Sequence, residues 1–214
     1  MPMPTSQPFP RVNDAAWQRR RLGLLVLLGL GAPVNVFAGA ADDVPADRLA
    51  AILARALAYD SSLAKRAGVA VDIGILIPPD APATHATLKK VVEGFRGIRD
   101  IRVGGLPMHV HEIVTDNLET LEAAIEHDHL DALFLTLAPG PERERVLRLC
   151  TAKNVLTMTN DRAAVEAGVA IGVAMFQEKP KIFINNVASK ATGVMFMTDL
   201  LRIATVIKEP EVTP

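Results

Sequence analysis

Cysteine is nearly absent from this chain. Cys150 is the only one, so no disulfide can form within the chain. Cys150 ends the helical pattern of residues 145–150, which favours a small buried side chain over a reactive thiol. A disulfide between two copies of the chain is the alternative. Because internal disulfides are excluded, the stability of the fold has to come from packing.

Basic runs are absent after residue 40. Without its first 40 residues the chain keeps 19 basic and 23 acidic side chains, which gives a net charge of −4. Proteins that bind nucleic acid need clustered basic side chains that neutralise phosphates. We therefore expect no nucleic-acid partner.

Motifs for catalysis are lacking as well. The sequence contains no G-x-S-x-G elbow, no G-x-x-x-x-G-K loop and no G-x-G-x-x-G fingerprint. His109 and His111 share one face of a predicted strand and could reach one metal ion, but their spacing matches no established ligand pattern. His127 and His129 flank a helix end, where the helix dipole favours imidazole without a metal. We expect no metal, no cofactor and no enzymatic activity.

The first 40 residues have the order of an export signal. Arg19–Arg21 precede the apolar run Leu22–Leu30, and Ala38–Ala40 matches the A-x-A pattern of a cleavage site. The alternative is a permanent membrane anchor, which needs about 20 apolar residues, whereas Pro33 and Asn35 interrupt this run. The pattern predicts a signal peptide over residues 1–40, cleavage near Ala40, a periplasmic product and no membrane span after cleavage.

Helical and strand patterns alternate along the rest of the chain. The predicted helices cover residues 46–59, 83–95, 141–153 and 161–166, with one more from Asp116 or Asn117 to about His127. The predicted strands cover residues 69–77, 108–114, 130–137, 155–159, 169–176 and 181–185. Strands separated by helices favour a parallel sheet, whereas the short link 177–180 can join only antiparallel neighbours. The fold class is therefore α/β: a single three-layer domain with a mainly parallel sheet flanked by helices and a C-terminal antiparallel hairpin strand.

One domain accounts for the whole chain after the signal peptide. It is predicted to cover residues 41–208, and residues 209–214 are predicted to be a disordered, solvated tail. The polar side of its closing helix includes Arg202, which we expect to face water or a partner. The apolar stripe of that helix consists of Met197, Leu200, Leu201, Ala204 and Ile207.

Polar loop residues follow three of the predicted strands. In open α/β sheets, ligands bind beyond the carboxyl ends of the strands. The alternative is that these residues form plain turns. If a pocket forms there, the chain is a single-lobe small-molecule binding protein of the periplasmic-binding type. The candidate residues are Asp80, Thr136, Thr159, Asn160 and Asp161.

Residues 130–207 resemble the C-terminal half of the YfiR family of exported bacterial proteins. The resemblance includes Leu156–Asp161 and Val169–Val173. It also includes a strand that ends in Ile-Asn, then spaced alanines, a glycine and a Leu-Leu-x-x-Ala helix. In this chain those positions are Ile184, Asn185, Ala188, Ala191, Gly193, Leu200, Leu201 and Ala204.

The resemblance implies a periplasmic regulator that binds the outer portion of an inner-membrane diguanylate cyclase and holds its cyclic-di-GMP output low. Family members with that role often carry several cysteines, and residues 46–129 agree with the family only in the order of elements. A sensor kinase or receptor is therefore an alternative membrane partner, and a homodimer stays open. Asn185 and Arg202 are candidate partner-binding residues, although Asn185 could instead satisfy backbone groups.

Overall fold

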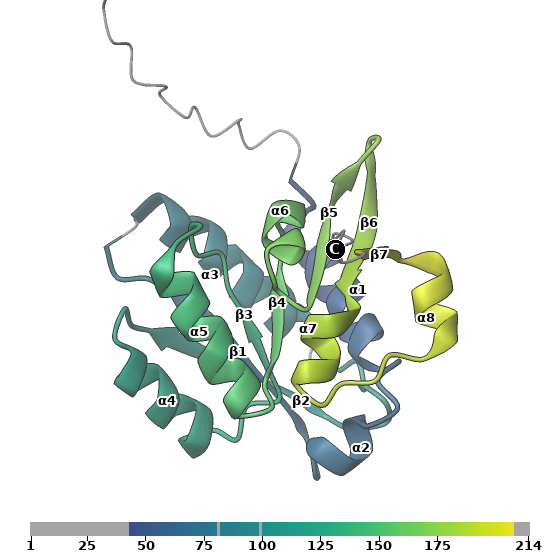
Figure 1. The fold of residues 1–214 in the computed structure, drawn as a ribbon, viewed down its shortest axis with the longest axis horizontal. Coiled ribbons are helices and arrows are strands. Elements are labelled where there is room, and N and C mark those ends of the chain that lie inside the picture. The colour runs from purple at the N-terminus through teal and green to yellow at the C-terminus, as the bar shows by residue number, and fades with distance from the viewer. Residues whose placement is uncertain (1–42, 81, 99, 208–214) are drawn as a thin grey trace, which may run out of the picture. The chain divides into compact units, whose positions relative to one another are not determined.

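The computed structural model describes residues 43–80, 82–98 and 100–207, all of which belong to one compact unit (Figure 1). The predicted signal peptide and the predicted tail lie outside the described residues. None of the helices in the described part is long and apolar enough to cross a membrane.

A seven-stranded sheet forms the centre of this unit, in the order β2-β1-β3-β4-β5-β6-β7. Neighbouring strands from β2 to β5 are parallel, β6 is antiparallel to β5, and β7 is parallel to β6. The predicted antiparallel hairpin is thus confirmed. The strands are β1 (Val71–Ile77), β2 (Met108–Val114), β3 (Ala132–Phe134), β4 (Leu156–Thr159), β5 (Ile171–Phe176), β6 (Lys179–Asn185) and β7 (Thr205–Ile207).

Helices cover both faces of the sheet and give the predicted three layers. α1 and α3 contribute to one hydrophobic core with Ile73 and Ile75 of β1, whereas α4 and α5 contribute to a second core with Leu76. Figure 1 shows α4 and α5 side by side on their face of the sheet. The helices are α1 (Ala46–Leu57), α2 (Leu63–Arg66), α3 (Pro82–Gly97), α4 (Leu118–His127), α5 (Pro141–Ala152), α6 (Arg162–Glu166), α7 (Asn186–Ala191) and α8 (Thr198–Ile203).

Local signals in the sequence explain several element boundaries. Asn117 caps α4, because its side-chain oxygen accepts hydrogen bonds from the N–H groups of Glu119 and Thr120. Cys150 is fully buried in α5, and burial raises the pKa of its thiol to about 12. The prediction of a small buried side chain at this position is therefore confirmed.

The prediction of one long closing helix is wrong. α8 ends at Ile203, and Thr205–Ile207 pair with β6 as the edge strand β7. The β-branched residues of β7 suit a strand, and β6 offers them an open edge. Of the predicted apolar stripe, Leu200 is buried, but Met197 is 44% exposed.

Candidate functional site

The carboxyl ends of β1, β3 and β4 lie next to one another, so the residues that follow these strands share one edge of the sheet. Asp80 is exposed there. The hydroxyl of Thr136 is buried and has no hydrogen-bond partner among the described residues. The structure thus brings the residues predicted to follow β1, β3 and β4 to one edge.

The turn after β4 uses its polar side chains internally. Thr159 is fully buried, and its hydroxyl accepts a hydrogen bond from the N–H of Asp161 at 3.3 Å. Asp161 caps α6 by accepting from the N–H of Ala163 at 2.8 Å. Asn160 lies between them and is half-buried. These contacts are those of an ordinary strand-to-helix turn, and the ligand-binding role of these residues stays a prediction.

Asn185 and Arg202 lie apart from this edge. Asn185 ends the antiparallel strand β6, so it lies at the opposite end of the sheet, where its N–H donates to the carbonyl of Ala170. Its side chain caps α7 by accepting from the N–H of Ala188 at 3.0 Å and donates to Val165 O at 3.2 Å. Arg202 is exposed on α8.

The cavity at the carboxyl edge is small. Its volume is about 60 Å³, and it lies between β1, α4 and α5, with Asn117 and Arg145 in its wall. None of the predicted site residues lines it. A cavity of this size holds one or two waters but no organic ligand.

A larger cavity opens at the amino ends of β3 and β4, and we call it the amino-end cavity. Its volume is about 680 Å³, within the range of about 300–1,000 Å³ that is usual for ligand sites. Ile125, Leu130 and Asp131 are its buried lining residues. The rest of the lining comes from α2, from the ends of α4 and α5, and from residues 193 and 195.

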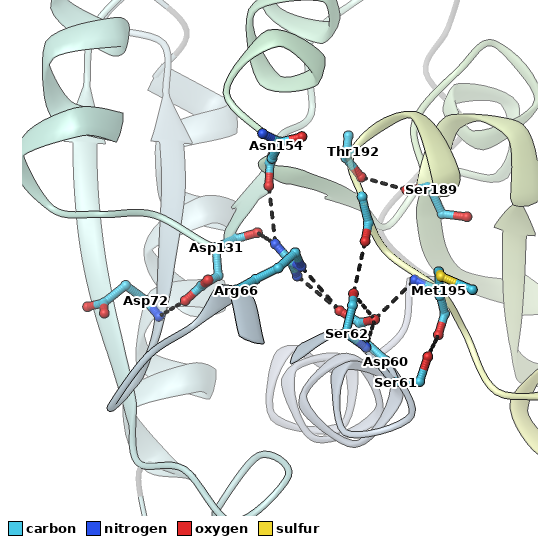
Figure 2. Close-up of polar contacts among 11 residues, drawn as sticks. Asp60, Ser61, Ser62, Arg66, Asp72, Asp131, Asn154, Ser189, Thr192 and Met195 are labelled. Atoms are coloured by element: carbon cyan, nitrogen blue, oxygen red, sulfur yellow. Dashed lines mark hydrogen bonds and ion pairs between the residues drawn. The ribbon is translucent and has the colours of Figure 1, made fainter. Parts of the chain in front are cut away.

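Asp60 is the centre of a polar network beside this cavity (Figure 2). It is 4% exposed, and its Oδ1 accepts from Ser62 N at 2.9 Å, Ser62 Oγ at 2.6 Å and Met195 N at 3.0 Å. Its Oδ2 accepts from Arg66 Nε at 3.3 Å and Nη2 at 3.1 Å. Asp60 therefore joins the turn before α2 to the loop before α8.

Arg66 extends this network across the amino ends of two strands. Its Nη1 donates to the carbonyl of Asn154, which lies before β4, at 3.1 Å, and to that of Asp131, which lies before β3, at 3.5 Å. Figure 2 shows the guanidinium between these two segments and Asp60. The spacing of Asp60 and Arg66 is no known motif, so the sequence offered no signal for the network.

Asp131 is the buried acid of the amino-end cavity. Its exposed fraction is 5%, its Oδ2 accepts from Asp72 N at 3.0 Å, and its own N–H donates to Asp72 O at 2.8 Å. Burial raises the pKa of Asp131, and the Asp72 carboxylate and Asp60 add to this effect. The Asp72 N–H and the Arg66 charge oppose it.

Three of the four histidines that the sequence singled out, His109, His111 and His127, form a chain of contacts with two aspartates. Asp72 Oδ1 lies 3.2 Å from His109 Nδ1 and 2.8 Å from His111 Nε2. Asp128 Oδ2 lies 3.5 Å from His111 Nδ1, and Asp128 Oδ1 lies 2.8 Å from His127 Nδ1. Within the described ranges, no three His, Cys, Asp or Glu side chains are grouped so that they could hold a metal ion.

The structure is thus a doubly wound α/β domain with its larger described cavity at the amino ends of β3 and β4. The chain belongs to the YfiR/HmsC-like family, whose model matches residues 77–205. The match confirms the resemblance read from residues 130–207 and extends it toward β1. Members of this family are periplasmic regulatory proteins rather than enzymes.

Two solved structures share the fold. One is the ABC domain in complex with L-Trp from Streptococcus pneumonia, with 14% identity, a TM-score of 0.51 and coverage of 76% of this chain. The other is a conserved domain protein from Vibrio cholerae O1 biovar El Tor, with 13% identity, a TM-score of 0.52 and coverage of 77% of this chain. The chain spans 60% of the length of each. No curated protein matches the chain.

Proposed function

We propose that this chain acts by binding the outer portion of an inner-membrane signalling protein and lowering the output of that protein. Membership of the YfiR/HmsC-like family over residues 77–205 carries the proposal. The partner of first choice is a diguanylate cyclase, and a sensor kinase is the alternative. No catalytic step is part of the proposal.

The proposed contact surface surrounds α8. Four large apolar side chains are exposed within twelve residues of the chain, and we call them the α8 surface: Met195, Met197, Ile203 and Val206, which are 60%, 44%, 65% and 36% exposed. Arg202 is exposed beside Ile203, and β7 is the outer strand of the sheet. Exposed apolar residues with a charge at the rim are typical of protein interfaces.

The exchange Arg202→Glu tests this surface. We expect about a tenfold weaker affinity for the partner's periplasmic domain, with the free energy of unfolding changed by no more than about 0.5 kcal/mol because the residue is exposed. Titration calorimetry and thermal melts measure the two effects. Arg55→Glu is the matched control, since Arg55 is an exposed arginine on α1.

Cyclic-di-GMP levels in the source cell separate the two partner classes. Deleting the gene should raise cyclic-di-GMP if the partner is a cyclase, and Arg202→Glu should reproduce the rise. An unchanged level together with altered phosphorylation of a response regulator favours the kinase. If deleting the gene changes neither the cyclic-di-GMP level nor the phosphorylation of a response regulator, the chain does not have the proposed function.

We also propose that residues 1–40 are a signal peptide that directs the chain to the periplasm, where residues 41–208 fold as one domain. N-terminal sequencing of the protein from the periplasmic fraction should begin near Ala41, because Ala38–Ala40 matches a cleavage pattern. A periplasmic protein that still begins at Met1 contradicts the cleavage, and a cytoplasmic one contradicts the export.

Binding of a small molecule is a second candidate function. The sequence placed such a site at the carboxyl ends of the strands, but the cavity described there is too small for an organic ligand, whereas the amino-end cavity is large enough. Its volume and its buried carboxylate favour this candidate.

A further inference from the structure

The cations that line the amino-end cavity are already engaged or face solvent. Arg66 is paired with Asp60, and its remaining contacts are to backbone carbonyls. Lys153 Nζ lies 2.7 Å from Glu122 and 2.5 Å from Glu126, and these hydrogen bonds raise the pKa of Lys153. Lys65 is exposed. Of the three lining cations, only Lys65 is therefore left without an ion-pair partner among the described residues.

Carboxylates at the cavity outnumber cations by one when the acids that pair with the lining cations are counted. Three cationic side chains line it, those of Lys65, Arg66 and Lys153, together with the carboxylates of Glu126 and Asp131. Two further carboxylates, those of Asp60 and Glu122, pair with Arg66 and Lys153. The carboxyl ends of α4 and α5 also reach the cavity, at His129 and Asn154. A helix carboxyl end carries partial negative charge and attracts cations.

Asp131 concentrates this negative charge at the buried side of the cavity. One oxygen accepts the N–H of Asp72, and the other has no hydrogen-bond partner among the described residues. The Arg66 charge acts on Asp131, but the ion pair of Arg66 is with Asp60, and a buried carboxylate without a directly paired cation is costly. A ligand cation that reaches Asp131 would supply the missing partner.

The rim of the cavity keeps polar side chains at positions where glycine is common. His129 and Asn154 follow α4 and α5 with φ of 51° and 57°, in the left-handed region. Helices usually place glycine at this position because other residues are strained there. Both residues line the cavity, and their side chains offer hydrogen-bond acceptors to a ligand.

We propose that the amino-end cavity binds a small organic amine, whose ammonium or guanidinium group pairs with Asp131. Asn154 and His129 accept hydrogen bonds from the same group, and Ile125, Leu130 and Met195 contact the hydrocarbon part. This inference deepens the second candidate function and does not require the membrane partner; Met195 is the residue that the cavity shares with the α8 surface.

Titration calorimetry with four probes tests the proposal on the mature protein. n-Butylamine and n-butylguanidine carry the two cationic groups, and 1-butanol and butyrate are the neutral and anionic controls of similar size. We expect both amines to bind at least tenfold more tightly than either control. The amine that binds more tightly shows whether an ammonium or a guanidinium suits the site. Equal binding of all four probes, or preference for butyrate, overturns the proposal.

Asp131→Asn removes the charge but keeps an oxygen that can accept the Asp72 N–H. We expect amine affinity to fall at least tenfold in this variant and to stay unchanged in Asp128→Asn, a nearby carboxylate that does not line the cavity. If Asp131→Asn fails to fold, Asn154→Gly replaces it, because glycine suits the φ of 57°. We expect that variant to bind the amines at least threefold less tightly, and unchanged amine affinity in the folded variant overturns the proposal.

The pH dependence provides a further readout. Because burial raises the pKa of Asp131, acid converts this carboxylate to its neutral form, and amine affinity should be lower at about pH 4.5 than at about pH 7.5. Amine affinity that is independent of pH contradicts the role of Asp131.

The inference and the proposed regulatory function can fail separately. If the mature protein binds its membrane partner but binds neither amine, the inference is refuted and the proposed regulatory function stands.

Discussion

Asp60→Ala is expected to lower the free energy of unfolding by about 3–5 kcal/mol. Removing one member of a buried ion pair leaves the other charge without a partner, and here the Arg66 side chain is only 13% exposed. The N–H of Met195 and that of Ser62 also lose their acceptor. Urea denaturation of the purified mature protein measures the loss.

Two controls show whether the loss comes from the network. Asp80→Ala removes an exposed carboxylate and should change stability by less than about 0.5 kcal/mol. The double variant Asp60→Ala/Arg66→Met should be more stable than Asp60→Ala alone, because the unpaired guanidinium is gone. A loss below about 1 kcal/mol in Asp60→Ala would mean that the pair does not hold the segments together.

Leu53→Ala is expected to lower the free energy of unfolding by about 2–5 kcal/mol, as is usual when a leucine in a core is truncated. Leu53 is fully buried in α1, in the core that α1 shares with α3 and the sheet. α1 lies before residues 77–205, which the family model matches. Arg55→Ala on the exposed side of α1 is the control.

The size of this effect tests the domain boundary. α1 and α3 approach so closely that a Cβ at Gly94 would lie 2.6 Å from the carbonyl oxygen of Ala46. If Leu53→Ala costs no more stability than Arg55→Ala, α1 is dispensable, and the domain would then begin after residue 57. A large loss supports a single domain that begins near residue 41.

Most of the fold was predictable because its signals are local. The alternation of apolar spacings placed β2 and α5 within a residue of their observed bounds, and the side chain of Asn117 marked the start of α4. The prediction of the closing helix was wrong after Ile203. Apolar residues continue at a helical spacing of three or four residues to Ala204 and Ile207, so the spacing favoured a longer helix. Pairing with β6 decides that segment, and a helical spacing carries no information about such a partner.

The amino-end cavity was not predictable in the same way. A general rule directed the search to the carboxyl ends of the strands, where Thr159 and Asp161 turned out to form a compact turn. The cavity at the other end depends on contacts between residues 60 and 195 and between residues 66 and 154. Such long-range contacts leave no periodic signal in the sequence.

The network around Asp60 has a consequence for the time course of folding. Ser62 Oγ donates a hydrogen bond to the carbonyl of Gly193, 131 residues away. Asp60 accepts one from the N–H of Met195, 135 residues away. Closing so long a loop costs entropy before any contact compensates for it, and structures dominated by distant contacts fold slowly. A ribosome must finish almost the entire chain before Asp60 meets Met195. The newly made polypeptide is therefore expected to lack this network during synthesis, which fits the export proposed above, because a protein has to be unfolded while it is threaded through a membrane channel.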